Sequence, residues 1–247
     1  MRCKLTYIHH NCFVMETDAR TYLFDLPGDN HMPVGHDLVD QAVSGSDLVV
    51  FVSHSHEDHL NEDLDSWISS AERVSYVISD DVEEMRPEAL PSEMEAVPKW
   101  GGMLIVEPDE VYEFEGMRIE TLMSNDLGVA FLVSDGDFRF YFGGDLAKWI
   151  WKNASDREQT FTSNFFREAM ERVHAFNPHV AFSNVDRRLE NLAGGLEAYS
   201  ETNANVFVPM HTFGDTSWLP ELTRSLDEEG PELFLYAAPG DSKEYSF

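Results

Sequence analysis

Three histidines and two acidic residues lie within six consecutive positions of this chain. His54, His56, Asp58 and His59 occur in the run SHSHEDH. Imidazole and carboxylate groups are the ligands that zinc and related divalent ions bind. Residues two apart in an extended chain point to the same side, so His54 and His56 would face one ion. The run predicts a metal site; the alternative is a solvated polar turn in which the histidines have no ligand role.

The chemistry of such a site is hydrolysis. A divalent ion lowers the pKa of bound water toward neutrality and polarises a carbonyl or phosphoryl oxygen. Asp58 is the predicted catalytic residue, because it could bind the metal and also orient the attacking metal-bound hydroxide. Other nucleophiles are disfavoured, since the sequence has no G-x-S-x-G motif and no P-loop. Cys3 and Cys12 lack the neighbouring base that marks a reactive thiol.

The elements around the cluster favour a site at the end of a strand. The apolar run Leu48–Val52 predicts a buried strand that stops just before His54. A helix is predicted over Asn61–Ser70 with Asn61 as its N-cap. Loops held between a strand and a helix are common positions for functional residues.

The remaining pattern predicts many strands followed by strand–helix pairs. Asp135-Gly136 between two apolar runs predicts a hairpin. Apolar residues at helical spacing predict a helix over Ser163–Phe176. Further helices are expected at Leu192–Glu201 and Trp218–Leu226, and further strands at Val180–Ser183 and Val206–Pro209. The acidic segments Asp80–Pro98 and Glu107–Glu115 are expected to be surface excursions. This order predicts two sheets covered by helices.

The run H-x-H-x-D-H resembles the signature of the metallo-β-lactamase-fold hydrolases. Further motifs of that family occur here in the same order: Asp25 in YLFDLPG, Asp145 in FGGDL and His211 in VPMHTFG. The resemblance implies a single domain over residues 1–247 with an α+β, αββα sandwich fold, two mixed β-sheets and helices on their outer faces. It implies that Asp25 supports the histidine loop and that Asp145 bridges two ions. The N-terminal YIHHNCFVMET is similar to the ascorbate-6-phosphate lactonase-like branch.

One family ligand is absent. The family usually has a third histidine for its first metal site, where this chain has the sequence SNDLG. This replacement resembles an uncharacterised sub-branch of the family. Asp126 is the candidate substitute ligand. The resemblance implies two ligand sets. They are His54, His56, Asp145 and Asp126 for the first ion, and Asp58, His59, Asp145 and His211 for the second. We expect one tightly bound ion and a weaker one, with zinc as the leading candidate and manganese or iron as alternatives.

Four further residues are predicted to contact the substrate. His10 lies between the first two strands, and Trp149 closely follows Asp145. Asp186 and Arg187 follow a predicted strand, where an Arg side chain would suit a carboxylate or phosphate. The alternatives are that His10 is a structural histidine in a turn and that the loop carrying Trp149 packs against the core. For Asp186 and Arg187 the alternative is a surface salt bridge.

Composition restricts the partners. The 247 residues contain 17 Lys+Arg against 46 Asp+Glu, a net charge of −29. Such a chain is poorly suited to nucleic acid or to anionic membranes. Two cysteines and no apolar leader predict a cytoplasmic protein. The expected function is hydrolysis of a small ester, lactone or phosphoester, including anionic substrates. The alternatives are a phosphodiesterase or nuclease of the same fold, or a non-catalytic metal-binding or sensing protein. The oligomeric state is left open.

Overall fold

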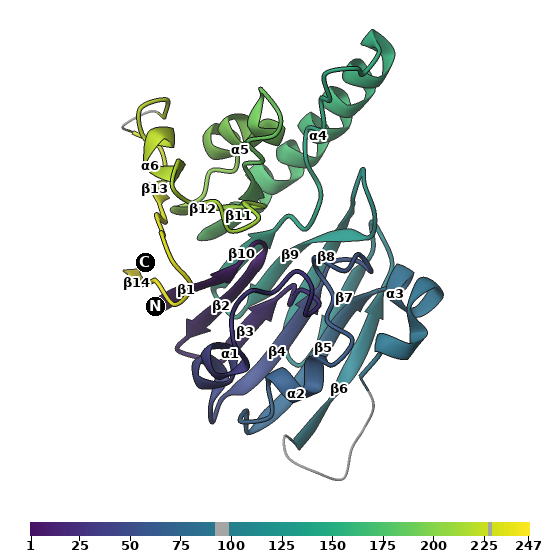
Figure 1. Cartoon of the computed structure of the whole chain (residues 1–247), viewed down its shortest axis with the longest axis vertical. Helices are drawn as coiled ribbons and strands as arrows, with labels where there is room; N and C mark the ends of the chain where they lie inside the picture. The colour runs from purple at the N-terminus through teal and green to yellow at the C-terminus, as the bar shows by residue number, and fades with distance from the viewer. Residues whose placement is uncertain (92–98, 227–228) are drawn as a thin grey trace. The chain divides into compact units, whose positions relative to one another are not determined.

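The computed structural model describes residues 1–91, 99–226 and 229–247, and it contains two mixed β-sheets with helices (Figure 1). The chain divides into two compact units, each built on one sheet. The first unit comprises Met1–Glu107 and Tyr236–Phe247, and the second comprises Pro108–Leu235. In the described part of the chain, no helix is both long enough and apolar enough to cross a membrane.

The sheet of the first unit has seven strands in the order β14-β1-β2-β3-β4-β5-β6. Its strands are β1 (Arg2–His9), β2 (Cys12–Thr17), β3 (Thr21–Phe24), β4 (Asp47–Val52), β5 (Arg73–Ser79), β6 (Lys99–Val106) and β14 (Ser242–Ser246). The pairs β14–β1, β1–β2 and β2–β3 are antiparallel. The pairs β3–β4, β4–β5 and β5–β6 are parallel. The inner strand β4 is buried along almost its whole length, as expected for a strand with parallel neighbours on both sides.

Helices cover one face of this sheet and close a hydrophobic core with it. The helices of the unit are α1 (His36–Val43), α2 (Leu64–Trp67), α3 (Asp80–Met85) and the 3-10 helix η1 (Pro87–Ala89). Val39 and Val43 of α1 and Trp67 of α2 are buried in one cluster with Val50 and Val52 of β4. The strand that precedes the histidine run is therefore anchored in this core.

The sheet of the second unit also has seven strands, in the order β13-β12-β11-β10-β9-β8-β7. Its strands are β7 (Val111–Phe114), β8 (Met117–Met123), β9 (Val129–Asp135), β10 (Phe138–Phe142), β11 (Val180–Asn184), β12 (Val206–Met210) and β13 (Glu232–Leu233). Strands β7 to β10 pair antiparallel, whereas β10 to β13 pair parallel. The hairpin predicted at Asp135-Gly136 is confirmed, because β9 and β10 pair antiparallel across it.

The long helix α4 is the main helix of the second unit. The unit contains α4 (Asp156–Phe176), α5 (Gly195–Glu201), α6 (Leu219–Leu222) and the 3-10 helix η2 (Leu192–Gly194). A capping box begins α4: Ser155 Oγ accepts from Glu158 N–H and the Glu158 carboxylate accepts from Ser155 N–H. Phe166, Met170 and Val173 are buried at helical spacing, so this amphipathic stripe packs α4 onto its unit.

Several predicted boundaries were wrong. The helix expected over Asn61–Ser70 is only α2, because Asn61 uses its amide to hold Pro27, Asp29 and Asp63 and does not cap a helix. Helix α4 begins seven residues before the predicted start, at its capping box. The two supposed surface excursions contain α3 and the edge strand β7, although residues 92–98 of the first lie outside the described residues.

Candidate metal centre

The histidine run begins at the carboxyl end of β4, as the sequence predicted. His54 is fully buried and His56 is exposed, yet His54 Nε2 and His56 Nδ1 lie only 3.0 Å apart. Two nitrogens bound to one tetrahedral zinc, each ~2.0–2.1 Å from it, would be roughly 3.3 Å apart. The two imidazoles therefore converge in the way that two ligands of a single ion do.

A buried carboxylate orients the two innermost imidazoles. Asp25 follows β3 and accepts from Ser53 N–H at 2.8 Å, Ser53 Oγ–H at 2.6 Å and His59 Nδ1 at 2.8 Å. Because Ser53 donates its single hydroxyl hydrogen to Asp25, its oxygen accepts from His54 Nδ1, 2.9 Å away. His54 and His59 thus carry their protons on Nδ1 and present the Nε2 lone pairs, as metal-binding histidines do.

The pKa of Asp25 reflects two opposing effects. Burial raises it, whereas the hydrogen bonds from His59 and Ser53 oppose the rise. Three donors around one carboxylate match its ionised, acceptor-only form.

Two other segments hold the backbone of the histidine loop. Ser55, between the two histidines of H-x-H, donates its N–H to Asp81 of α3 at 2.8 Å. Gly28 donates its N–H to Glu57 O at 2.7 Å, and a Cβ on Gly28 would meet that oxygen at 3.2 Å. The loop after β3 and helix α3 after β5 thereby support the loop after β4 from both sides. These three parallel strands bring their carboxyl ends to one edge of the sheet, where ligands commonly bind.

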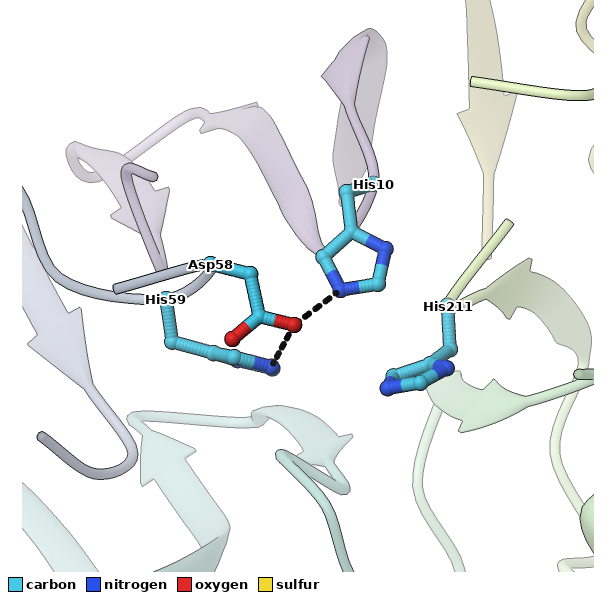
Figure 2. Close-up of side chains that lie close together, drawn as sticks. All are labelled: His10, Asp58, His59 and His211. Carbon is cyan, nitrogen blue, oxygen red and sulfur yellow. Dashed lines mark ion pairs between the residues drawn. The ribbon is translucent and has the colours of Figure 1, made fainter. Parts of the chain in front are cut away.

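Asp58 lies between two further imidazoles. Its Oδ2 is 3.4 Å from His10 Nε2 and 3.9 Å from His59 Nε2 (Figure 2). His10 belongs to the turn between β1 and β2 and is 1% exposed. The structure therefore brings the predicted substrate contact His10 beside two predicted metal ligands of its own unit.

In the second unit, Asp145 follows the parallel strand β10 and is held by its flanking backbone. Asn184 donates from Nδ2 to Gly144 O at 3.0 Å, and Gly144 has a φ of 48° that favours glycine. On the other side, Asn125 donates to Ala147 O at 2.8 Å and accepts from Ala147 N–H at 3.2 Å. Asn125 of the SND triplet thus has a positioning role, fixing the turn that carries Asp145.

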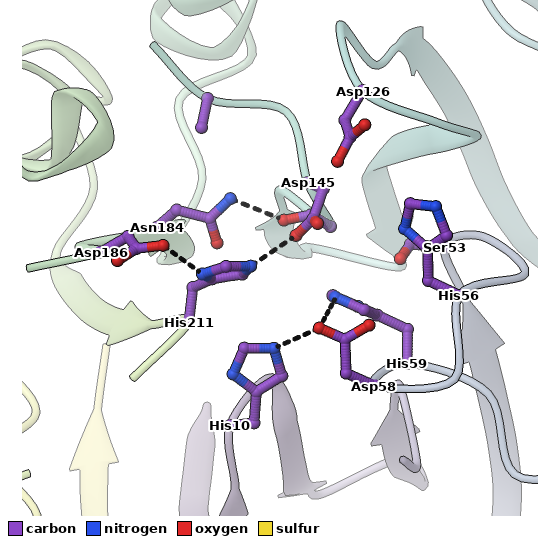
Figure 3. Close-up of polar contacts among 12 residues, drawn as sticks. His10, Ser53, His56, Asp58, His59, Asp126, Asp145, Asn184, Asp186 and His211 are labelled. Carbon is purple, nitrogen blue, oxygen red and sulfur yellow. Dashed lines mark hydrogen bonds and ion pairs between the residues drawn. The ribbon is translucent and has the colours of Figure 1, made fainter. Parts of the chain in front are cut away.

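His211, after β12, lies between two carboxylates (Figure 3). Its Nδ1 is 3.2 Å from Asp186 Oδ2 and its Nε2 is 3.4 Å from Asp145 Oδ1. Burial would raise the pKa of Asp186, but hydrogen bonds from His211 and Arg188 hold it well below its usual range. The Asp186 carboxylate therefore lies against the Nδ1 side of His211, and Nε2 is the nitrogen that faces Asp145.

The predicted substrate residues of the second unit lie in different surroundings. Trp149 donates from Nε1 to Asp145 O at 3.0 Å, and its ring contacts His211 edge-on. Asp186 contacts His211, as described above. Arg187 is exposed and pairs with Asp215 at 2.8 Å. The structure thus places Trp149 and Asp186 beside a predicted metal ligand, while Arg187 faces a surface carboxylate.

Asp126 is exposed. Among residues 1–91, 99–226 and 229–247, it is in no group of three or more ligand-type side chains close enough to share an ion. Its backbone N–H donates to Ser124 Oγ at 3.2 Å. Its role as a ligand stays a prediction.

Three positioning residues were not predicted from the sequence. Arg188 donates from Nε to both oxygens of Asp186, at 3.0 and 2.9 Å, and its guanidinium lies 4.3 Å from the Phe213 ring centroid. Ser53 orients His54, and Asp81 holds Ser55. Ser53 had a signal, since it directly precedes His54, whereas Asp81 lies in the acidic segment Asp80–Pro98, which was expected to be a surface excursion.

The donor set fits a divalent ion. The pairs His54–His56, His10–Asp58 and Asp145–His211 have ligand atoms 3.0, 3.4 and 3.4 Å apart, close to the spacing of ligands around one ion. A thiol nucleophile is disfavoured, because burial and the charge of Glu16 raise the pKa of Cys3 to about 12, and burial and the charge of Asp25 raise that of Cys12 well above its usual value.

Comparison with known proteins identifies the family. Residues 4–159 match the model described as "Beta-lactamase superfamily domain", so the chain belongs to that superfamily. The predicted fold class, α+β of metallo-β-lactamase type with two mixed sheets, is confirmed. No curated protein matches the chain.

Solved structures share the fold at low sequence identity. Igni18, a metallo hydrolase from Ignicoccus hospitalis, is 14% identical, with a TM-score of 0.65 and full coverage of both chains. YhfI from Bacillus subtilis is 15% identical, with a TM-score of 0.60 over 99% of each chain. An isothiocyanate hydrolase from Delia radicum gut bacteria is 14% identical, with a TM-score of 0.56, covering 97% of this chain and 98% of its own.

Proposed function

We propose that this protein is a metal-dependent hydrolase of small molecules. The observation that carries the proposal is that two buried histidines, His54 and His59, present Nε2 because a hydrogen bond at Nδ1 fixes the tautomer. A third buried histidine, His211, has Nδ1 only 3.2 Å from Asp186. A purely structural histidine does not need this arrangement, whereas a metal ligand does. Similarity to the hydrolases named above supports the same class.

The ligands would come from both units, as the family resemblance implies. We propose His54, His56 and Asp145, with Asp126 as the candidate fourth ligand, for one ion. Asp58, His59, Asp145 and His211 would hold the other. Zinc is the leading candidate, with manganese and iron as alternatives. The first ion has only three ligands unless Asp126 also binds, so we expect it to bind more weakly than the second.

When bound, a divalent ion supplies Lewis acidity and water of lowered pKa. Asp58 is the proposed catalytic residue, and its carboxylate would orient the attacking water. Trp149 would border the substrate beside His211, and Arg187 would need to exchange Asp215 for an anionic substrate group. Esters, lactones and phosphoesters are the proposed substrate classes, and the ascorbate-6-phosphate lactonase-like branch and a cytoplasmic location are part of the same proposal.

The test combines metal content with hydrolysis. Purified protein should contain bound divalent metal and should hydrolyse at least one substrate from a panel of lactones, thioesters and bis-aryl phosphates. His56→Ala and Asp58→Asn should abolish turnover with an unchanged circular dichroism spectrum, while the exposed Glu57→Gln serves as the matched control. Activity that survives in both variants would refute the hydrolase mechanism. Activity confined to bis-aryl phosphates would favour the phosphodiesterase alternative.

One observation favours the non-catalytic alternative. Asn125, in the triplet that replaces the third histidine, hydrogen bonds to Ala147 and to Thr162, which is a structural role. If the protein binds metal stably but turns over none of the panel, a metal-binding or sensing role would replace the hydrolase proposal.

A further inference from the structure

His10 is held rigidly in an unusual backbone conformation. It has a φ of 53°, a left-handed value that is uncommon for residues other than glycine, although histidine adopts it more often than most. The hydroxyl of Tyr7 accepts the His10 N–H at 3.3 Å, and the Tyr7 ring stacks on Tyr236 of the same unit at 4.0 Å between centroids. Such strain persists only where the surrounding structure enforces it, and it is concentrated at functional sites.

The side chain of His10 faces the carboxylate of Asp58. The 3.4 Å separation between His10 Nε2 and Asp58 Oδ2 is longer than the 2.7–3.2 Å of ordinary hydrogen bonds. His59 Nε2 lies 3.9 Å from the same oxygen, and the rings of His10 and His59 meet edge-on with centroids 5.3 Å apart. The 3.4 Å separation is close to that of two ligands of one ion, and the 3.9 Å separation is somewhat longer.

The proton on His59 is already assigned. Its Nδ1 donates to Asp25 at 2.8 Å, so Nε2 presents a lone pair on the side of Asp58. A neutral His10 with its proton on Nδ1 would present a second lone pair there. Two imidazole nitrogens and one carboxylate oxygen make a ligand set suited to zinc or a similar ion.

We propose that His10 Nε2 is a direct ligand of the ion held by Asp58 and His59. This inference rests on the proposed metal-dependent function and goes beyond the substrate contact predicted for His10. It gives the second metal site an additional nitrogen from the turn between β1 and β2, in a chain whose first site lacks a family histidine. The ion at the second site should therefore be the tightly bound one.

The test replaces His10 and follows the metal itself. His10→Gln and His10→Cys are compared with the wild type and with His9→Gln and His9→Cys. His9 is the matched control, because it is a buried histidine at the adjacent position. Its electrostatic interaction is with His31, which is not one of the proposed metal ligands. Metal content after dialysis and affinity from chelator competition are measured for Zn²⁺, and absorption spectra are recorded for the Co²⁺-loaded proteins. Thermal unfolding of the apoproteins reports folding.

His10→Gln should weaken Zn²⁺ binding at the tight site by at least about 10-fold. Loss of a residue that only hydrogen bonds to a metal ligand already lowers metal affinity by about that factor. His10→Cys should restore binding and add a thiolate-to-cobalt charge-transfer absorption that the wild type and His9→Cys lack. Either of two results would overturn the proposal and leave His10 as a positioning or substrate residue. The first is that His10→Gln binds Zn²⁺ with wild-type affinity. The second is that a folded, cobalt-loaded His10→Cys shows no thiolate band.

The two proposals fail in different ways. Wild-type protein that binds no divalent metal would refute the proposed function. Wild-type protein that binds metal and hydrolyses substrate, with a tight site insensitive to His10→Gln, would refute only the assignment of His10.

Discussion

At the scale of single residues, hydrogen bonds decide which ring nitrogen of the buried histidines carries the proton and which can bind a metal. Asp25 fixes the tautomer of His59 directly and that of His54 through Ser53. Asp186 lies 3.2 Å from Nδ1 of His211 and is itself held by Arg188. A carboxylate therefore stands behind His54, His59 and His211, and these partners should matter almost as much as the ligands.

Ser53→Ala tests this arrangement. Removal of the hydroxyl leaves His54 Nδ1 without its acceptor, so the ring can rotate or change tautomer, and metal affinity should fall by about 10- to 100-fold. Chelator competition measures the change. Ser75→Ala is the control, since Ser75 is also a buried serine, on the neighbouring strand β5. Equal affinities of the two variants would contradict the relay from Asp25 to His54.

Asn125→Ala tests how Asp145 is positioned. The amide makes three hydrogen bonds, two to Ala147 and one to Thr162, and each neutral hydrogen bond contributes roughly 0.5–1.5 kcal/mol. The free energy of unfolding in urea should fall by about 1–3 kcal/mol, and metal affinity should fall with it. Ser200→Ala, which removes an exposed hydrogen bond to the Leu196 carbonyl oxygen, should change neither by a comparable amount. Unchanged metal affinity in Asn125→Ala would show that Asn125 does not position Asp145 for metal binding.

At the scale of elements, parallel strands place the functional residues. Asp25, the histidine run and Asp81 follow β3, β4 and β5, which run parallel. Asp145, Asp186 and His211 follow β10, β11 and β12, which are also parallel. In each sheet, residues distant in sequence meet because the carboxyl ends of parallel strands share an edge.

Helix α3 contributes to this arrangement through one side chain. Asp81 accepts the Ser55 N–H, so Asp81→Ala should release the backbone between His54 and His56. We expect metal affinity to weaken by about 10-fold or more, measured by chelator competition, with little loss of secondary structure. Glu84→Ala on the exposed side of the same helix should retain wild-type affinity. A wild-type result for Asp81→Ala would show that the loop is held without α3.

Sequence reasoning predicted the strand ends better than the supports behind them. The apolar run before His54 and the ligand spacing of H-x-H-x-D-H predicted a site at the end of β4, where the structure places these residues. Asp81 was missed, because an acidic segment with prolines carries no apolar periodicity that would reveal α3. The first turns of α4 were missed for the same reason, although the capping box at Ser155 marks its start. Hydrogen bonds between distant loops, such as that of Asn125, have no local signal in one sequence.

At the scale of the whole molecule, a net charge of −29 affects how metal binding is measured. Clusters of exposed carboxylates attract divalent cations without a built site, and this attraction is screened by salt. Binding at the centre should differ, because imidazole nitrogens prefer zinc to hard ions such as Mg²⁺. Tight binding of Zn²⁺ that persists at high ionic strength would therefore distinguish the centre from the acidic surface.

Removal of the metal tests whether the ligands of the two units act together. An ion that binds only the folded chain stabilises it by RT ln(1 + [L]/Kd), about 2.7 kcal/mol at 100 times Kd. Chelation should therefore lower the unfolding temperature, and Mg²⁺ in place of Zn²⁺ should not restore it. Hydrogen exchange compared with and without Zn²⁺ should show slower exchange around His54–His59 in the first unit and around Asp145 and His211 in the second. Protection confined to one unit would show that its ligands hold the metal alone, against the shared set that the family resemblance implies.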